Sequence, residues 1–108
     1  MHVLTAKLLK EAADRFRDAA KPIAAWRSIA KDKRWRSPGE VSETFADVEC
    51  VGDYVIFRLH QNKYRLVTTV HYAREKDGAI ADGHIWVRSF LNNKQYENPV
   101  NWDKGVLR

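Results

Sequence analysis

The chain has 108 residues, of which 44% are hydrophobic and 31% are charged. This length predicts one domain, residues 1–108, with a single modest core. No apolar run reaches the roughly 18 residues that a membrane span needs, so we expect no membrane association. The formal net charge is +5, which favours an anionic partner, with nucleic acid the commonest. The alternative is a surplus that only keeps a small domain in solution.

The positive surplus lies mainly in the N-terminal part. Residues 1–46 carry ten Lys and Arg against six Asp and Glu, and residues 47–108 carry nine against eight. The N-terminus turns amphipathic at once and lacks the apolar core of a signal peptide, so a cytoplasmic protein is expected. Cys50, the one cysteine, is interpreted as a small core residue of a reduced protein. The alternative, a catalytic thiol, lacks an activating base nearby in the sequence.

The N-terminal part predicts a short strand and two helices. "MHVL" alternates like a strand, and Thr5 is placed to cap the helix that follows. Pro22 suits the first turn of the second helix, because its missing N–H would be unpaired there anyway. The short connection predicts an antiparallel helical hairpin. The predicted buried stripes are Leu8, Leu9, Ala12, Ala13 and Phe16 in the first helix, and Ile23, Trp26, Ile29 and Ala30 in the second.

The C-terminal part predicts strands. The basic stretch 31–40, in which Trp35 is expected to plug the core, is closed by the Pro38–Gly39 turn signal, and Val41 and Phe45 are assigned to a short third helical turn. From residue 48 the hydrophobic period becomes two, and residues 53–60, 63–72 and 84–91 each resemble a strand. Residues 60–63 predict a hairpin connection and residues 74–83 a longer loop. The sequence thus predicts an α+β fold, with the helical hairpin packed on one face of a small, mainly antiparallel sheet.

Alternation divides each predicted strand between two faces. One set is apolar and should face the helices: Val55, Phe57 and Leu59, then Tyr64, Leu66, Thr68 and Val70, then Ile85, Val87, Ser89 and Leu91. The other set is basic and should lie on an open face, with the aromatic side chains of Trp86 and Phe90 between the cations. This basic set consists of Arg58, Arg65, Arg88 and His71.

Two interpretations of the basic face remain open. Guanidinium groups match phosphate geometry, and aromatic rings among them can stack on bases, which favours single-stranded RNA. The alternative is a solvated face in which each arginine pairs with a carboxylate. No group of His, Cys and carboxylates has the spacing of a zinc site, so neither a metal nor another cofactor is expected.

Three stretches then coincide: "NKYRLV" (62–67), "HIWVRSF" (84–90) and "NNKQYEN" (92–98). Together with Trp26, "RWRSPGEVSETF" (34–45) and "VGDYVIF" (51–57), they make the chain resemble the HigB family of toxins from type II toxin–antitoxin systems, a branch of the RelE-like fold. The resemblance runs from about residue 2 to residue 98. It implies an mRNA endoribonuclease that acts on the translating ribosome and is neutralised by a HigA-like helix-turn-helix antitoxin. It also implies operator DNA binding, mainly through the antitoxin.

The resemblance implies a site at the end of the last strand. Arg65 and Arg88 would stabilise the charge of the phosphorane-like transition state, and Asn93 would hold the phosphate or a base. Tyr96 or Lys94 would transfer the proton, with neighbouring positive charge expected to lower both pKa values. The predicted substrate contacts are Arg58, His71, Trp86 and Asn92, with His71 also the outside candidate for the proton transfer.

One departure from the family pattern bears on activity. The usual strand-end motif is Thr-His-x-x-Tyr-Asp, and here Asn93 replaces the histidine, whereas Tyr96 is kept and Glu97 lengthens the acid. An asparagine transfers no proton near neutral pH. The alternative function is therefore a catalytically degenerate module of the same fold that binds RNA or an antitoxin without cutting. A third reading is an unrelated structural α+β domain.

Overall fold

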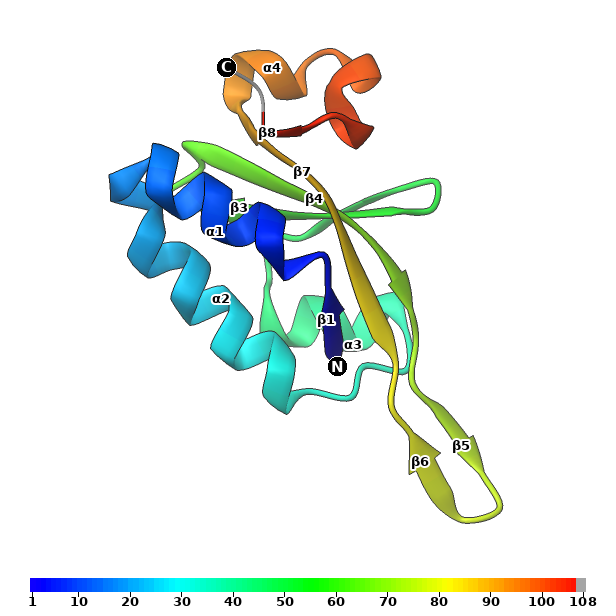
Figure 1. Ribbon diagram of the computed structural model, residues 1–108. Coiled ribbons are helices and arrows are strands. Elements are labelled where there is room, and N and C mark those ends of the chain that lie inside the picture. Colours follow the sequence, from blue (N-terminus) through cyan, green and yellow to red (C-terminus); the bar gives the residue numbers. More distant parts are fainter. Residues whose placement is uncertain (107–108) are drawn as a thin grey trace.

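The structure is a computed structural model that describes residues 1–106, and Figure 1 shows its helices α1 and α2 together on one side of a twisted sheet. A first short strand and the N-terminal helices precede a run of six strands, which two short helices and a last short strand follow. In order, the elements are β1 His2–Leu4, α1 Ala6–Arg15, η1 Arg17–Ala19, α2 Ala20–Asp32, α3 Pro38–Thr44, β2 Glu49–Val51, β3 Tyr54–Leu59, β4 Tyr64–His71, β5 Arg74–Lys76, β6 Ala79–Ala81, β7 His84–Asn92, α4 Asn93–Tyr96, η2 Pro99–Asp103 and β8 Gly105–Val106.

The main sheet has the strand order β1-β7-β4-β3-β2, with β8 also paired to β7. The pairs β2–β3, β3–β4 and β4–β7 are antiparallel, whereas β1 and β8 run parallel to β7. The prediction of a mainly antiparallel sheet in a mixed α and β fold is thus confirmed. The predicted strands at residues 53–60, 63–72 and 84–91 correspond to β3, β4 and β7.

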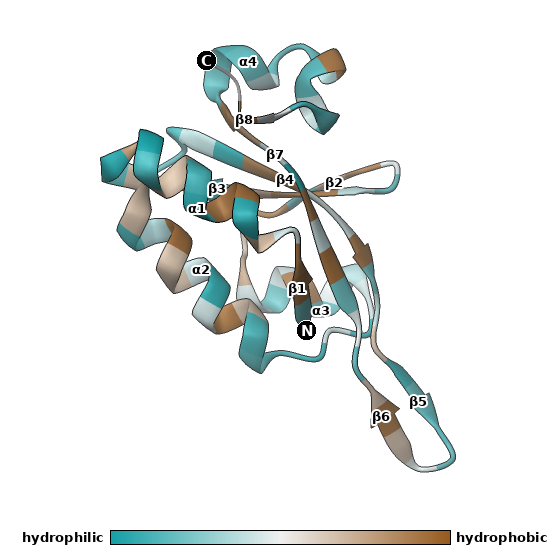
Figure 2. Ribbon diagram, viewed as in Figure 1, coloured by the Kyte–Doolittle hydropathy of each residue, from teal (hydrophilic) through white to brown (hydrophobic). Residues whose placement is uncertain are grey.

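The helices α1 and α2 bury apolar side chains against one face of the sheet. Leu9, Ala12, Ile23, Trp26 and Ala30 belong to the same core as Val55, Phe57 and Leu66 of the strands. Figure 2 shows the mixture of hydrophobic and hydrophilic segments along both helices. Ile29 departs from the predicted stripe, because 39% of it is exposed. No helix within residues 1–106 is long and apolar enough to cross a membrane.

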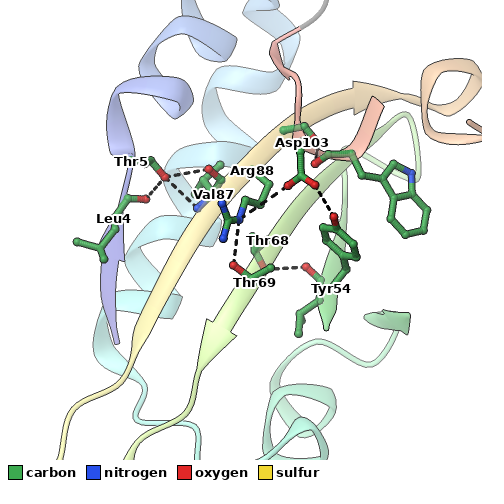
Figure 3. Close-up of polar contacts among 11 residues, drawn as sticks. Leu4, Thr5, Tyr54, Thr68, Thr69, Val87, Arg88 and Asp103 are labelled. Carbon is green, nitrogen blue, oxygen red and sulfur yellow. Dashed lines mark hydrogen bonds and ion pairs between the residues drawn. The ribbon is translucent and has the colours of Figure 1, made fainter. Parts of the chain in front are cut away.

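The role predicted for Thr5 is wrong. Its side chain makes no capping hydrogen bond to α1. Instead, the Thr5 hydroxyl donates to the carbonyl of Val87 at 2.9 Å and accepts from the Val87 N–H at 3.0 Å (Figure 3). The side chain therefore ties β1 to β7 in place of satisfying the free N–H groups of the helix.

A β-bulge in β7 changes the alternation of its side chains. Val67 of β4 pairs with Ser89, but the next residue, Thr68, pairs with Val87, so Arg88 is the extra residue. Such an insertion reverses the phase of the strand beyond it. The faces predicted for residues 89–91 are therefore wrong: Phe90 packs in the helix-side core, whereas Leu91 belongs to a second core on the opposite face.

The face predicted to be open is covered at its centre. Trp102 of η2 is 7% exposed and packs with Ile56, Val67 and Leu91, and Tyr54 and Tyr96 close the sides of this second core. The Ser89 hydroxyl donates to the Trp102 carbonyl at 2.8 Å, which helps hold η2 on the sheet. The basic face is thus divided by an apolar cover that the sequence did not predict.

Two further predictions need correction. Residues 74–83 are more than a loop: β5 and β6 form a separate two-stranded sheet around Asp77 and Gly78. Both turn residues have positive φ, which suits the tight hairpin turns that favour Asp-Gly. Figure 1 shows this hairpin projecting away from the rest of the molecule.

Cys50, predicted to lie in the core, is exposed because it sits on the edge strand β2. Trp35 is buried as predicted.

Candidate functional site

Four polar side chains meet on one side of the Trp102 cover, where α4 follows β7. The Tyr96 hydroxyl donates to Glu49 Oε2 at 3.0 Å, and Arg58 Nε donates to Glu49 Oε1 at 2.9 Å. The guanidinium of Arg65 lies 5.3 Å from the centroid of the Tyr96 ring. We call Glu49, Arg58, Arg65 and Tyr96 the tyrosine cluster.

Pairing between strands brings the cluster together. Arg58 of β3 is directly opposite Arg65 of β4, and Glu49 lies on the neighbouring strand β2. The Tyr96 ring is stacked on Trp102, with centroids 5.1 Å apart and planes at 6°, while Trp102 Nε1 donates to the Tyr96 carbonyl at 2.9 Å. The cover therefore fixes the tyrosine both by its ring and by its backbone.

Tyr96 is held in its protonated form. Burial, together with its hydrogen bond to Glu49, raises the pKa of Tyr96 to about 12. The expectation that positive neighbours lower this pKa is wrong, because Arg65 and Arg58 oppose the shift but do not outweigh burial and the carboxylate. In turn, the hydrogen bond from Arg58 lowers the pKa of Glu49. At neutral pH the cluster therefore holds a carboxylate and a phenol, which can respectively accept and donate a proton.

Arg65 has unused hydrogen-bonding capacity. Its Nη1 donates to the carbonyl of Asn62 at 2.7 Å, but its Nε is buried and has no partner among residues 1–106. A buried N–H without an acceptor is costly, typically about 1–3 kcal/mol. Because this atom is buried, an anion would contact the Nε only after the Arg65 side chain moved.

Arg88 lies on the other side of the cover, in a second group of polar side chains (Figure 3). Its Nε donates to the Thr69 hydroxyl at 3.1 Å and lies 3.9 Å from Asp103 Oδ1. Asp103 also accepts a hydrogen bond from Tyr54, which raises the pKa of that phenol. These side chains line a pocket of about 420 Å³ that includes none of the tyrosine cluster.

The structure thus separates two residues that the sequence grouped. Arg65 is paired with Leu91, whereas Arg88 is the bulged residue beside Val87 and Ser89. Trp102, which packs on Leu91 and Val67, lies on the face between the two arginines. Arg65 and Tyr96 are close together, and Arg88 is paired elsewhere.

The amides that follow β7 begin a helix. The Asn92 side chain accepts from the Gln95 N–H at 2.8 Å, and the Gln95 side chain accepts from the Asn92 N–H at 3.0 Å. This reciprocal capping box starts α4. Asn93 and Lys94 occupy the first turn of α4 with exposed side chains. The amides therefore position the turn that carries Tyr96.

His71 and Trp86 lie toward the opposite end of the strands. His71 is paired with His84 across β4 and β7, and His84 is paired with His2 across β7 and β1. Trp86 is next to His84, with ring centroids 5.7 Å apart. These rings form a row that is separate from the tyrosine cluster. No group of three or more His, Cys, Asp or Glu within residues 1–106 is arranged to hold a metal ion.

Sequence reasoning missed Glu49. Its role depends on β2 lying beside β3, and β2 is too short to give a periodic signal. The only local hint is an acidic residue in an otherwise strand-like stretch that precedes the Gly52–Asp53 turn.

A comparison with protein-family models gives one match, to HigB_toxin, described as the RelE-like toxic component of a toxin–antitoxin system. The match covers residues 19–99, which is most of the chain and includes the whole tyrosine cluster. A search of curated proteins finds no match.

Proposed function

Because the chain belongs to the HigB toxin family of RelE-like toxins, we propose that it is a metal-independent endoribonuclease that cleaves mRNA on the ribosome. A toxin of this kind implies an antitoxin partner, and we propose a HigA-like helix-turn-helix protein that neutralises it and makes most of the operator contacts. We also propose that α1 and α2, joined by η1, form the helical hairpin of this fold. The cytoplasm, where mRNA is translated, is the proposed location.

The tyrosine cluster carries this proposal. In metal-free RNA cleavage the ribose 2′-OH attacks the adjacent phosphate, so the site needs a proton acceptor, positive charge and a proton donor. Arg65, with its buried unpartnered Nε, and Arg58 supply the charge. The pKa of Tyr96 is about 12, so its hydroxyl stays protonated at neutral pH. It is therefore suited to protonate the leaving 5′-oxygen and poorly suited to act as the base.

Glu49 is the proposed proton acceptor. Its carboxylate is ionised at neutral pH, and the hydrogen bond from Arg58 lowers its pKa below the ordinary 4.5. A phosphate that takes over the contact with Arg58 would weaken this effect and raise the pKa of Glu49 toward that of a useful base. The 2′-OH would then give its proton to Glu49 while the 2′-oxygen forms a bond to the adjacent phosphorus. The bond from phosphorus to the 5′-oxygen would break, and Tyr96 would give its proton to that leaving oxygen.

The remaining predicted residues receive supporting roles in this proposal. Asn93 and Lys94, exposed on the first turn of α4, contact the RNA backbone beside the cluster, and Asn92 shapes that turn. Arg88 binds a neighbouring phosphate in exchange for Asp103. His71 and Trp86 contact a more distant part of the RNA. In the alternative function, which the separation of Arg88 from the tyrosine cluster favours, the same surfaces bind RNA without cleavage.

Two single substitutions in the tyrosine cluster test the proposal. Tyr96→Phe keeps the ring that stacks on Trp102 but removes the proton, and Glu49→Gln keeps the shape but removes the base. We expect each to reduce mRNA cleavage on translating ribosomes by about 100-fold or more.

The matched control is Tyr54→Phe, which also loses a hydrogen bond to a carboxylate but lies outside the tyrosine cluster. It should retain most of the cleavage. If the folded Tyr96→Phe variant cleaved mRNA as well as the wild type does, Tyr96 would not be the proton donor. Absence of cleavage by the wild-type chain, with RNA still bound, would establish the binding alternative.

A further inference from the structure

A groove between α1 and α2 lies on the side of the sheet opposite the tyrosine cluster. It has a volume of about 470 Å³. Leu9 and Ile23 line the groove but are only 2% and 4% exposed, so they offer a ligand little surface. The small side chains of three alanines leave its floor open to larger groups. These alanines are Ala13, Ala20 and Ala24.

The rim of the groove is positively charged. Lys10, Arg27 and Lys31 line it, and no carboxylate does. These three cations form no ion pair with any residue in the described part of the chain. Arg27 and Lys31 also line an adjoining pocket beside β1, where the carboxylate of Asp82 is paired with the N-terminal amine of Met1.

An apolar floor with a cationic rim selects a particular kind of ligand. RNA phosphates would gain from the cations but nothing from covering the apolar surface of the three alanines, and no aromatic ring in the lining offers a base to stack on. An amphipathic helix presents apolar side chains three and four positions apart, and these fit a groove between two helices. Acidic side chains beside those anchors would meet the three unpaired cations.

We propose that this groove binds an acidic amphipathic segment of the antitoxin. The antitoxin is the partner that the toxin family implies, so the proposal does not depend on RNA cleavage. The apolar anchors of the segment enter over Ala13, Ala20 and Ala24, and its carboxylates pair with Lys10, Arg27 and Lys31. Because the groove and the tyrosine cluster lie on opposite faces, the docked segment leaves the cluster uncovered.

Charge reversal at the rim tests the proposal. The probe is the protein encoded beside the toxin gene, purified and titrated calorimetrically into the full toxin chain. The triple variant Lys10→Glu, Arg27→Glu and Lys31→Glu should bind about 100-fold more weakly. The matched control reverses three exposed cations elsewhere, Arg74, Lys76 and Lys104, and should bind within about threefold of wild type.

A second variant tests the floor without changing charge. Ala24→Phe fills the groove from an exposed helix position and should weaken binding by about tenfold or more while far-ultraviolet circular dichroism stays native. Unchanged affinity in both folded groove variants would overturn the proposal. Loss of ribosome association by the charge-reversed variant, with antitoxin affinity unchanged, would overturn it as well and assign the rim to RNA. All these readouts are independent of cleavage.

Discussion

At the scale of single residues, Thr5 occupies a left-handed backbone conformation, with φ of 60°, that a β-branched residue seldom adopts. Its two hydrogen bonds to Val87 compensate, because they join the end of β1 to the middle of β7. No local sequence pattern indicates this contact with Val87, because a threonine before a helix is typical of a helix cap. The sequence therefore predicted where Thr5 lies but not what its hydroxyl contacts.

Thr5→Val should destabilise the protein by about 1–3 kcal/mol, because it removes both bonds and leaves the Val87 N–H without an acceptor. Urea unfolding measures the change. Ser42→Ala, which removes an exposed hydroxyl bonded only within its own helix, should stay within about 0.5 kcal/mol of wild type. Equal effects of the two substitutions would contradict the role of Thr5.

The carboxylate of Glu49 should make stability depend on pH. Its folded pKa lies below the ordinary 4.5, first because Arg58 donates to it. A depressed pKa stabilises the folded state above the unfolded pKa, and this contribution disappears as the pH falls through the folded value. Glu49→Gln should therefore be less stable than wild type near pH 7, and the difference should shrink at about pH 3.

Unfolding of both proteins at a series of pH values measures this effect. The control is Glu43→Gln, an exposed glutamate of α3 that forms no ion pair within residues 1–106. Its stability should follow the wild-type curve. If the difference in free energy of unfolding between Glu49→Gln and the wild type did not change with pH, Glu49 would contribute no charge-dependent stability.

At the scale of elements, alternation located β3, β4 and β7 because each has one face against the helices. It did not locate β5 and β6, whose residues are all exposed, so no apolar period marks them. The Asp77–Gly78 pair was the available signal for that hairpin. Nor did it locate the cover formed by η2, because burial of Trp102 depends on Ile56, Val67 and Leu91, which are distant in sequence.

Gly83 fixes the base of the β5–β6 hairpin. A Cβ on this residue would lie 2.3 Å from the carbonyl oxygen of His71 and 2.7 Å from the Ala73 nitrogen, and neither backbone atom can move easily. Gly83→Ala should therefore cost about 3 kcal/mol or more, at the upper end of overpacking effects. Thermal unfolding provides the measurement.

Gly39→Ala is the matched comparison. Its Cβ would lie an ordinary 3.7 Å from Ser37 Oγ, in the first turn of α3. Alanine is the better helix former, so this change should stabilise the protein by roughly 0.5–1 kcal/mol. A harmless Gly83→Ala would mean that the hairpin base repacks more freely than its contacts indicate.

At the scale of the whole molecule, the sheet separates two cores of unequal size. The helix-side core follows from the apolar stripes, and the sequence predicted most of it. The second core, and with it the tyrosine cluster, depends on η2 folding back over the sheet. For this reason the sequence identified Arg65 and Tyr96 as neighbours in function but missed Glu49, and it grouped Arg88 with a site from which Trp102 separates it.

Trp102→Ala should cost about 3–5 kcal/mol, as expected for removing a large buried aromatic side chain. It should also release Tyr96, whose ring stacks on Trp102. We expect faster amide hydrogen exchange in α4 and η2, while the amides of α1 and α2 remain protected. Uniform loss of protection across both faces would show that the two cores unfold as one unit.

The bulge at Arg88 decides which core each of the last side chains of β7 enters. Phe90 and Leu91 follow the inserted residue, and Phe90 packs beneath the helices whereas Leu91 packs beneath Trp102. Without that extra residue, the alternation of the strand would place Leu91 beneath the helices and Phe90 beneath Trp102. One inserted residue therefore directs the aromatic ring into the larger core and supplies the smaller core with its leucine.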